Sequence, residues 1–450
     1  MMRVFDVPRA QLGNQWCAPA YLARTRAGRP TTKGRSTRLG DIAAIRSGLY
    51  VPQYREEGSP YLRVDNVREF QLNLNVGDVE LVDPADGNIR PRHLAAAGDV
   101  IIARTGTLGK AALIPPHLDG AVLSQHVTSL RCVPEVPSGY LATVLNLPFC
   151  KEQILGAAFG STRLELTHEA LSGIAVPLVA AEDMRRLSKR VDESVDANMR
   201  ADIELQDCAR RFEQILGIEQ VPTPSNPLHF TAANVAEADI WSPSFFAPDL
   251  LAFDAWLADV FECKRLGEVS SIERGRGTRV DDYARSGVPF IRTSSIINHT
   301  IDPFPDHYAT AETVTRFGQP IKEGDLLVSI EGKIGMIAYL SETQQCVFKN
   351  HVERVRGLGQ LDSVYLFLFL RTRFAQAQLR RFTVVQATLP GLASRLRDVQ
   401  IPVSKRYDAN HFKDAAGKIC IDARAALTRK SRAHAAWAEA KIELAHLIAD

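Results

Sequence analysis

The chain repeats itself, and this duplication limits what it can fold into more than any other feature. The segment RLGDIAAIRSG, which begins at Arg38, returns as RLGEVSSIERG at Arg265, a shift of 227 residues. The segment GDVIIARTGTLGKAALI at Gly98 returns as GDLLVSIEGKIGMIAYL at Gly324, a shift of 226. Repeats in the same order with a nearly constant offset indicate two copies of one structural unit. We therefore expect two similar globular bodies within the 450 residues.

Within each copy, a region of strands is followed by a long helix. Short apolar runs separated by glycine, proline and asparagine predict strands joined by tight turns. From Glu182 to Leu216 there is no glycine or proline, and apolar residues recur every seven positions, with Asn198 in the same seam. This heptad pattern predicts a helix, roughly 50 Å long, that packs against a second helix. A polar seam residue such as Asn198 would fix the register of that pair at some cost in stability.

The boundaries of five segments follow from these patterns. Residues 1–180 form a first globular domain, and residues 181–218 form the central long helix. Residues 219–228, which are rich in proline and polar side chains, form a linker. Residues 229–403 form the second globular domain, and residues 404–450 form the C-terminal long helix. The predicted fold class is α/β (mixed α+β): a tandem pseudo-repeat of two globular domains joined by two long antiparallel coiled-coil helices.

The residues expected to pack the two long helices against each other lie in their apolar seams. These residues are Leu187, Val191, Asn198, Leu205, Phe212, Phe412, Ile419, Leu427, Trp437 and Leu444. The simplest arrangement is an antiparallel coiled coil of the two helices. The alternative is that each helix covers only its own globular domain.

Composition narrows the class of protein. The formal net charge is only +2, so any binding to nucleic acid must come from local patches. The seven cysteines are scattered without metal-ligand spacing, which favours free thiols in a reducing cytoplasm. The N-terminal residues lack the apolar core of a signal peptide. The longest apolar run, near Tyr365–Leu370, is too short to span a bilayer, so we expect no membrane association.

The ordered, duplicated motifs resemble those of the specificity subunit of type I restriction-modification enzymes. The motifs are RLGDIAAIRSG, PYLRVDNV, GDVIIARTGTLGKAALI and GIAVPL, each with its counterpart in the second copy, and the resemblance covers nearly the whole chain. It implies that the two globular domains are target-recognition domains, each reading one half of a split site on double-stranded DNA. It also implies that the helices set the distance between the half-sites. The stretch up to Arg38 is longer and more basic than this family's pattern predicts.

The same resemblance implies partners and the division of chemistry between them. Two methyltransferase subunits, and in restriction-competent assemblies motor-nuclease subunits, would bind the chain. S-adenosylmethionine and ATP with Mg²⁺ would bind those partners, and no cofactor or metal would bind this chain. Because the two copies have diverged at their polar loop residues, the site should be asymmetric and interrupted. The alternative is a stand-alone DNA-binding adaptor, or an accessory of phage defence, with the same fold.

Residues expected to contact DNA are basic or amide side chains and hydroxyls in the loops of each copy, since these groups bind phosphates and base edges. In the first copy they are Arg46, Arg63, Asn66, Arg68, Lys110, Gln125 and His126. In the second copy they are Arg274, Arg276, Arg279, Arg292, Ser294, Ser295, Lys333, Asn350 and His351. Residues that the copies share, such as the two histidines, can equally serve folding. The basic run from Arg24 to Arg38 is either an arm on the DNA backbone or a solvated linker.

Catalytic interpretations are weaker. Asp325, Glu331 and Lys333 have the spacing of a metal-dependent nuclease, but the first copy has Asp99, Thr105 and Thr107 at the matching positions. The sequence contains no phosphate-binding GxxxxGK[ST] loop and no GxSxG nucleophile motif. The tetrapeptide typical of adenine methyltransferases is also missing. We therefore expect a non-catalytic subunit.

Overall fold

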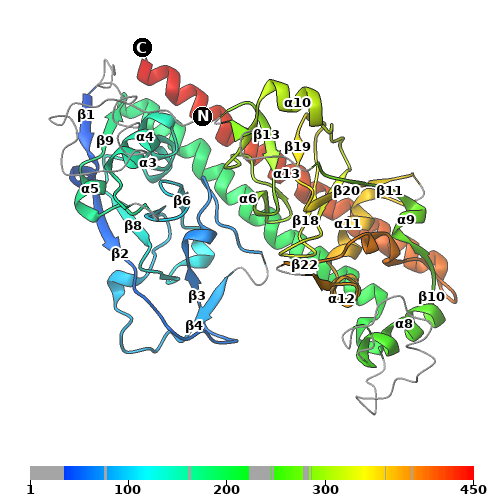
Figure 1. The fold of residues 1–450 in the computed structure, drawn as a ribbon. Helices are drawn as coiled ribbons and strands as arrows, with labels where there is room; N and C mark the ends of the chain where they lie inside the picture. Colours follow the sequence, from blue (N-terminus) through cyan, green and yellow to red (C-terminus); the bar gives the residue numbers. More distant parts are fainter. Residues whose placement is uncertain are drawn as a thin grey trace. The chain divides into compact units, whose positions relative to one another are not determined.

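The computed structural model describes residues 35–75, 79–160, 164–221, 245, 248–276, 283–284, 286–359, 361–386 and 389–449. The chain divides into two compact units (Figure 1). Unit 1 consists of residues 1–199 together with 432–450, and unit 2 consists of residues 200–431. Unit 1 therefore draws on both ends of the chain.

The central sheet of unit 1 has four antiparallel strands in the order β2-β8-β5-β6. These strands are β2 (Ala43–Ser47), β8 (Val127–Cys132), β5 (Val100–Ala103) and β6 (Ala111–Leu113). Every residue of β5 and β6 is buried, which explains why their sequences are continuous apolar runs. A smaller sheet has the order β4-β3-β7, and a separate strand pair has the order β1-β9. Their bounds are β4 (Glu80–Val82), β3 (Ser59–Leu62), β7 (Val122–Leu123), β1 (Arg35–Arg38) and β9 (Ala175–Leu178).

Unit 2 repeats the central sheet of unit 1 and adds strands around it. Its central sheet has the order β11-β20-β17-β18. These strands are β11 (Ser270–Arg274), β20 (Val352–Gly357), β17 (Leu326–Ser329) and β18 (Ile337–Tyr339). The second sheet has the order β12-β16-β13-β19, and β10 pairs with β23 as β1 pairs with β9. Their bounds are β12 (Tyr283–Ala284), β16 (Tyr308–Ala309), β13 (Val288–Ile291), β19 (Val347–Phe348), β10 (Phe261–Arg265) and β23 (Gln400–Lys405).

The duplication extends to the register of individual strand pairs. Tyr61 of β3 lies opposite Val122 of β7 in a parallel pair, and Phe290 of β13 lies opposite Val347 of β19 in the same way. A slip of one residue would turn every side chain of a strand to the other face of its sheet. The predicted tandem repeat is therefore confirmed at the level of side-chain direction.

The duplicated Gly-Asp motif forms a turn that an arginine fixes in place. In unit 1, the Asp99 carboxylate accepts hydrogen bonds from Arg131 Nε at 2.8 Å and Nη2 at 3.0 Å. In unit 2, the Asp325 carboxylate accepts the equivalent bonds from Arg356 at 2.7 and 2.6 Å. Each carboxylate also accepts a backbone N–H from its own turn. Two-point arginine–carboxylate pairs hold a defined geometry, so both aspartates serve the fold.

The two glycines that follow in each motif are turn residues. Gly106 and Gly109 have φ of 65° and 83°, and Gly332 and Gly335 have φ of 75° and 81°. Side chains rarely tolerate this left-handed region, whereas glycine adopts it freely. The recurring Gly-x-x-Gly therefore connects β5 to β6 and β17 to β18.

Two short helices in each unit cover the central sheet. They are α3 (Ser138–Leu145) and α4 (Pro148–Ala157) in unit 1, and α11 (Ser363–Arg371) and α12 (Arg373–Arg381) in unit 2. Gln153 of α4 exchanges two hydrogen bonds with the backbone of Ala175 in β9. Gln378 of α12 does the same with Gln400 in β23. The glutamine thus joins helix to strand identically in both copies. An additional helix in unit 2, α8 (Pro248–Val260), packs on α12 through stacked rings of Phe253 and Phe374, 4.0 Å apart.

The long helices are α6 (Ala181–Leu216) and α13 (Ala409–Ala449), and they pack on each other in both units. In unit 1, Glu443 of α13 forms ion pairs with Arg186 and Arg190 of α6. In this unit Leu187, Val191, Asn198, Trp437 and Leu444 are buried. The C-terminal end of α13 therefore lies along the N-terminal end of α6.

In unit 2 the opposite ends of the two helices meet. Ion pairs join Asp202 to Lys430 at 2.6 Å, Glu204 to Arg429, and Arg211 to Asp422 at 2.8 Å. The buried seam residues here are Leu205, Phe212, Phe412, Ile419 and Leu427. As residue numbers rise along α6 they fall along α13, so the helices are antiparallel. The predicted fold class is confirmed, and the alternative of helices that cover only their own domains is wrong.

One turn in each unit docks the sheets onto the helices, with different chemistry in the two copies. Phe70 in unit 1 and His299 in unit 2 occupy matching positions with φ of 66° and 67°, rare for side chains of this size. Phe70 stacks on Trp437 of α13 with ring centroids 5.7 Å apart. His299 Nε2 accepts a hydrogen bond from Arg371 Nη2 at 3.0 Å, and Arg371 also donates to the Leu205 carbonyl of α6 at 3.3 Å.

A second contact strengthens this docking in unit 1. The buried Glu69 carboxylate, next to Phe70, accepts hydrogen bonds from Lys441 Nζ of α13 at 2.6 Å and from Lys151 of α4. A buried carboxylate is stable only when it is paired in this way. The sheet region, the covering helix and α13 are thus joined at one point.

In the part of the chain that the structure describes, no helix is both long enough and apolar enough to cross a membrane.

We predict that Lys430→Ala strongly destabilises unit 2. The Lys430 side chain is fully buried, and its removal leaves the Asp202 carboxylate without this cation at the helix seam. Breaking a buried ion pair on one side costs roughly 3–5 kcal/mol. Thermal unfolding followed by circular dichroism measures the loss. The matched control is Lys189→Ala, which removes an exposed cation of α6 that lies 3.9 Å from Glu193 and should leave the melting temperature unchanged. Equal melting temperatures for the two variants would contradict the prediction.

We also predict that His299 makes stability fall in mild acid. Burial, followed by the nearby charges of Arg371 and Lys430, holds the pKa of His299 well below its usual range. Above the unfolded pKa of about 6.5 the imidazole is neutral in both states, and this stability is fully present. Below that pH the unfolded chain binds a proton that the folded chain resists, so stability decreases as the pH falls toward the folded pKa.

The comparison that isolates this effect uses His299→Phe, which installs the residue found in unit 1. Its melting temperature should fall less than that of the wild type between pH 7.5 and 5.5. His411→Phe, which alters an exposed histidine of α13, should retain the wild-type dependence. A His299→Phe profile parallel to that of the wild type would show that other groups cause the loss.

Candidate nucleic-acid interface

Four of the residues predicted to contact DNA are buried in this conformation: Asn66, Arg68, Lys110 and Ser295. Asn66 Oδ1 accepts the backbone N–H of Arg63 at 2.8 Å, and Ser295 Oγ accepts that of Arg292 at 3.1 Å. These matching bonds close a single 3-10 turn after β3 and after β13. Asn66 also donates from Nδ2 to the Asn73 carbonyl at 3.0 Å. Asn66 and Ser295 thus stabilise the backbone that carries their more exposed neighbours.

The other predicted contact residues that the structure describes keep accessible surface. In unit 1 these are Arg46, Arg63, Gln125 and His126, all half-buried. In unit 2, Arg274, Arg276, Ser294 and Lys333 are exposed, whereas Arg292, Asn350 and His351 are half-buried. Arg279 lies outside the described residues, as does the basic run up to residue 34. Contact of these residues with DNA remains a prediction.

Several candidates of unit 2 converge on Glu331, in the turn after β17. Arg274 forms an ion pair with the Glu331 carboxylate and donates from Nε to the Asn350 carbonyl at 2.9 Å. His351 Nε2 lies 3.2 Å from the same carboxylate. The end of β11 and the loop before β20 are thereby joined to the turn. Arg274 remains 44% exposed at its side chain, so it still offers donors to a ligand.

In unit 1, the backbone carbonyl that matches that of Asn350 accepts a hydrogen bond from an arginine next to a different strand. Gln125 occupies the position of Asn350, and its carbonyl accepts a hydrogen bond from Arg104 Nη2 at 2.8 Å. Arg104 follows β5, whereas Arg274 ends β11. The two units therefore share the carbonyl position but present a guanidinium from different directions. Arg104 is not among the residues predicted from the sequence, although its counterpart Ile330 shows that a basic residue is present at this position in one copy alone.

The nuclease-like spacing of Asp325, Glu331 and Lys333 does not form a metal site. Both Asp325 carboxylate oxygens are bound by Arg356, and Glu331 is bound by Arg274 and His351. Among the described residues, no group of three or more histidine, cysteine, aspartate or glutamate side chains is placed to hold a metal ion. The geometry therefore gives no support to metal-dependent cleavage by this chain.

Two buried cysteines, Cys150 and Cys346, are not placed for nucleophilic chemistry. Burial raises the pKa of Cys150 in unit 1 and of Cys346 in unit 2 to about 12. The thiolate is the reactive form of cysteine, and at neutral pH these thiols remain protonated. Both side chains act as small apolar groups of the core.

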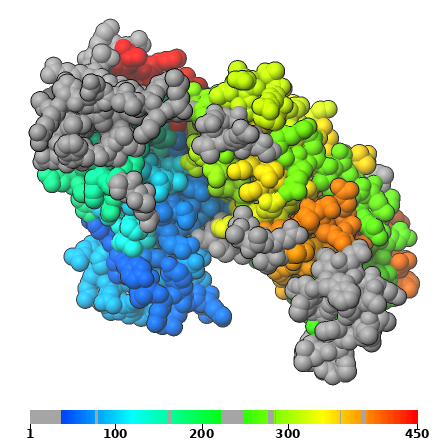
Figure 2. Space-filling view, viewed as in Figure 1, coloured from blue at the N-terminus to red at the C-terminus, as the bar shows by residue number. Residues whose placement is uncertain are grey.

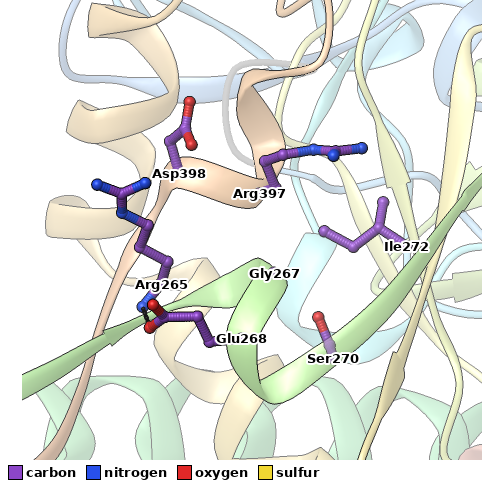
Figure 3. A pocket seen from close by; sticks show the side chains of 7 residues that line it. All are labelled: Arg265, Gly267, Glu268, Ser270, Ile272, Arg397 and Asp398. Atoms are coloured by element: carbon purple, nitrogen blue, oxygen red, sulfur yellow. Dashed lines mark hydrogen bonds between the residues drawn. The ribbon is translucent and has the colours of Figure 1, made fainter.

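A pocket of about 290 Å³ opens in unit 2 where α9 (Leu266–Val269) meets residues 395–398 (Figure 3). Its lining is Arg265, Gly267, Glu268, Ser270, Ile272, Arg397 and Asp398. Glu268 already accepts the backbone N–H of Arg265 at 2.8 Å, which caps the short helix. Arginines and carboxylates alternate around the opening, so the lining concentrates neither sign of charge. We assign this pocket no ligand.

No protein-family model and no curated protein sequence matches the chain. Solved structures do match it. They include the S subunit of a type I restriction-modification system from M. genitalium, with a TM-score of 0.34, 13% identity, and coverage of 94% of this chain and 96% of that one. The HsdS subunit from Thermoanaerobacter tengcongensis matches with a TM-score of 0.29 and 18% identity, covering 92% and 96%. Over nine-tenths of its length, the chain is similar to such S subunits.

A third match comes from a structure of a type I R-M system described in terms of its complex assembly and conformational transition. The TM-score is 0.28 and the identity 18%, with coverage of 91% of this chain and 98% of that one. All three TM-scores lie below 0.5.

Proposed function

We propose that this chain is the DNA-reading, non-catalytic specificity subunit of a type I restriction-modification methyltransferase. The observation that carries this proposal is the duplicated sheet arrangement combined with the antiparallel pairing of α6 and α13. Two similar bodies connected by continuous helices suit a bipartite target, because each can occupy one half-site of a duplex. The protein would act in the cytoplasm, where the DNA is.

The two half-sites should differ in sequence. Framework contacts such as Asp99–Arg131 and Asp325–Arg356 are the same in both units, but the accessible loop residues are not. Gln125 matches Asn350, and Arg104 replaces Arg274 as the guanidinium at the shared carbonyl. Since bases are distinguished by the side chains that reach their edges, different loop residues imply different bases.

The outer faces of the helices would hold the catalytic partners. Ile203 of α6 and Ile421 and Ile442 of α13 are exposed, at 51%, 69% and 59%. These side chains would add apolar contacts to a surface that binds a partner. Two methyltransferase subunits with S-adenosylmethionine would bind here, joined in restriction-competent assemblies by motor-nuclease subunits with ATP and Mg²⁺.

Co-purification tests this proposal. The tagged full-length chain, expressed in its native host, should recover an adenine or cytosine methyltransferase in a ratio of two to one. Sequencing of modified bases in the host genome should then show an interrupted, asymmetric motif that disappears when the gene is deleted. Recovery of the chain alone, with no motif lost on deletion, would favour the stand-alone adaptor.

The helices should determine the spacer between the half-sites. We predict that removal of one facing heptad from each helix, residues 198–204 and 428–434, shortens the spacer by about three base pairs. Seven residues contribute about 10 Å along a helix, and base pairs are about 3.4 Å apart. A heptad is close to two full turns, so the faces of the remaining residues are nearly preserved. The deletion also removes both members of the Asp202–Lys430 pair, so neither is left unpaired.

Modified-base sequencing in cells that carry this variant provides the measurement. Both half-sites should be unchanged while the number of unspecified bases between them falls. Deletion of residues 222–228, in the predicted linker, is the matched control and should leave the spacer intact. Altered half-sites with an unaltered spacer would contradict the role assigned to the helices.

A further inference from the structure

The hydroxyl of Tyr61 fixes a short segment of unit 1 on both sides of Tyr50. It donates a hydrogen bond to the Leu49 carbonyl at 2.8 Å and accepts one from the Val51 backbone N–H at 3.3 Å. Tyr61 itself is 2% exposed, so its ring is held by the core. The backbone on each side of Tyr50 is thereby tied to one buried anchor.

The residues before Tyr50 are equally constrained. Leu49 donates its backbone N–H to the Leu123 carbonyl at 2.9 Å and forms a parallel bridge with Ser124. A Cβ atom at Gly48 would lie 2.1 Å from the Leu123 carbonyl oxygen, so only glycine permits this approach. The position of the backbone at Gly48 and Leu49 is therefore fixed.

The Tyr50 side chain is held out from this rigid backbone. It is 67% exposed, one of the most exposed large apolar side chains in the described part of unit 1. Residues 35–100, blue in Figure 2, form much of the visible surface of unit 1 on the face shown. Exposure on a mobile loop would be unremarkable, but here the backbone is fixed while the ring is left in solvent.

Residues predicted to contact DNA lie beside the Tyr61 anchor. Gln125 Oε1 lies 3.4 Å from the Tyr61 hydroxyl, and the Arg63 guanidinium lies over the Tyr54 ring at 5.7 Å. The Tyr54 ring in turn lies 6.0 Å from the Tyr61 ring. An aromatic ring, an amide and an arginine thus share one neighbourhood.

The second copy of the sequence lacks both tyrosines of this arrangement. Phe290 occupies the position of Tyr61 in unit 2 and has no hydroxyl with which to hold a loop. Tyr50 lies two residues after Gly48, and the residue two positions after the matching Gly275 is Gly277, which has no side chain. Tyr54, by contrast, has a counterpart in Tyr283, whose ring lies 4.8 Å from Phe290, so Tyr54 is part of the shared framework.

We propose that Tyr50, presented by the Tyr61 hydroxyl, contacts a base pair in the half-site read by unit 1. This inference rests on the proposed function. An apolar ring in the major groove suits the thymine methyl group, and the neighbouring Gln125 amide suits the adenine edge. The preferred pair is therefore A·T. Because its backbone is already fixed, the ring loses little conformational freedom on binding.

Selection from a library of random-sequence duplexes tests the proposal, because it identifies the bound motif directly. The full-length wild type, with any methyltransferase that co-purifies, is compared with Tyr50→Ala. The wild type should enrich a two-part motif. Tyr50→Ala should lose the preference for A·T at one or two positions of one half, and retain the other half unchanged. Affinity for the wild-type motif should fall roughly tenfold, as expected for one lost base contact.

Two further variants separate reading from folding. Tyr61→Phe keeps the buried ring and removes the anchor, so it should weaken the same positions by a smaller factor. Tyr407→Ala removes a 90% exposed tyrosine from unit 2 and should alter neither half. Melting temperatures of Tyr50→Ala and Tyr407→Ala should match the wild type. That of Tyr61→Phe should be slightly lower, because the Leu49 carbonyl and the Val51 N–H lose their shared partner.

Each alternative outcome has a distinct meaning. A motif unchanged in Tyr50→Ala would overturn this inference and leave the proposed function standing. Equal loss from both halves would show that Tyr50 supports binding in general, which also overturns it. If the wild type enriches no motif, the proposed function fails, and the inference fails with it.

Discussion

Each unit takes part of its core from the helix that follows the other copy of the repeat, and the rest of the structure depends on this exchange. In unit 1 the last turns of α13 bring Trp437 onto Phe70 and Lys441 onto Glu69. In unit 2 the last turns of α6 bring Leu205 and Phe212 into the same apolar cluster as Phe412 and Leu427. Truncation of a buried aromatic such as Trp437 costs about 3–5 kcal/mol, a large part of the stability of a domain. Neither copy of the repeat is therefore a complete folding unit.

The duplicated contacts divide the molecule into a conserved framework and divergent loops. The aspartate–arginine turns, the helix-to-strand glutamines and the parallel registers of β3 with β7 and β13 with β19 are the same in both units. Around the Gln125 and Asn350 carbonyls, the arginine comes from a different strand in each unit. Close packing tolerates little change in the framework, whereas a loop side chain can change at low cost.

Sequence reasoning predicted the features that depend on short-range pattern. Apolar runs predicted the strands. The heptad pattern of α6 predicted the seam in which Leu205 and Phe212 are buried. It could not predict which polar loop residues are buried, because Asn66 and Ser295 are typical of DNA-contacting loops but here accept backbone hydrogen bonds within a turn. It also missed Arg104 and Tyr50. The positions of Arg104 and Tyr50 depend on hydrogen bonds made by Gln125 and Tyr61, and no spacing rule relates such partners.

Placing Gly48 against the Leu123 carbonyl has a consequence for how the protein can evolve. The residues between Gly48 and Gly58 enter and leave their loop at points that the framework holds. Substitutions of its exposed residues, such as Tyr50, leave the anchoring backbone bonds in place, so inherited changes at these positions can alter surface chemistry without eroding stability. Natural variation in such a protein should therefore accumulate between fixed glycines, as a new specificity arises on an old scaffold.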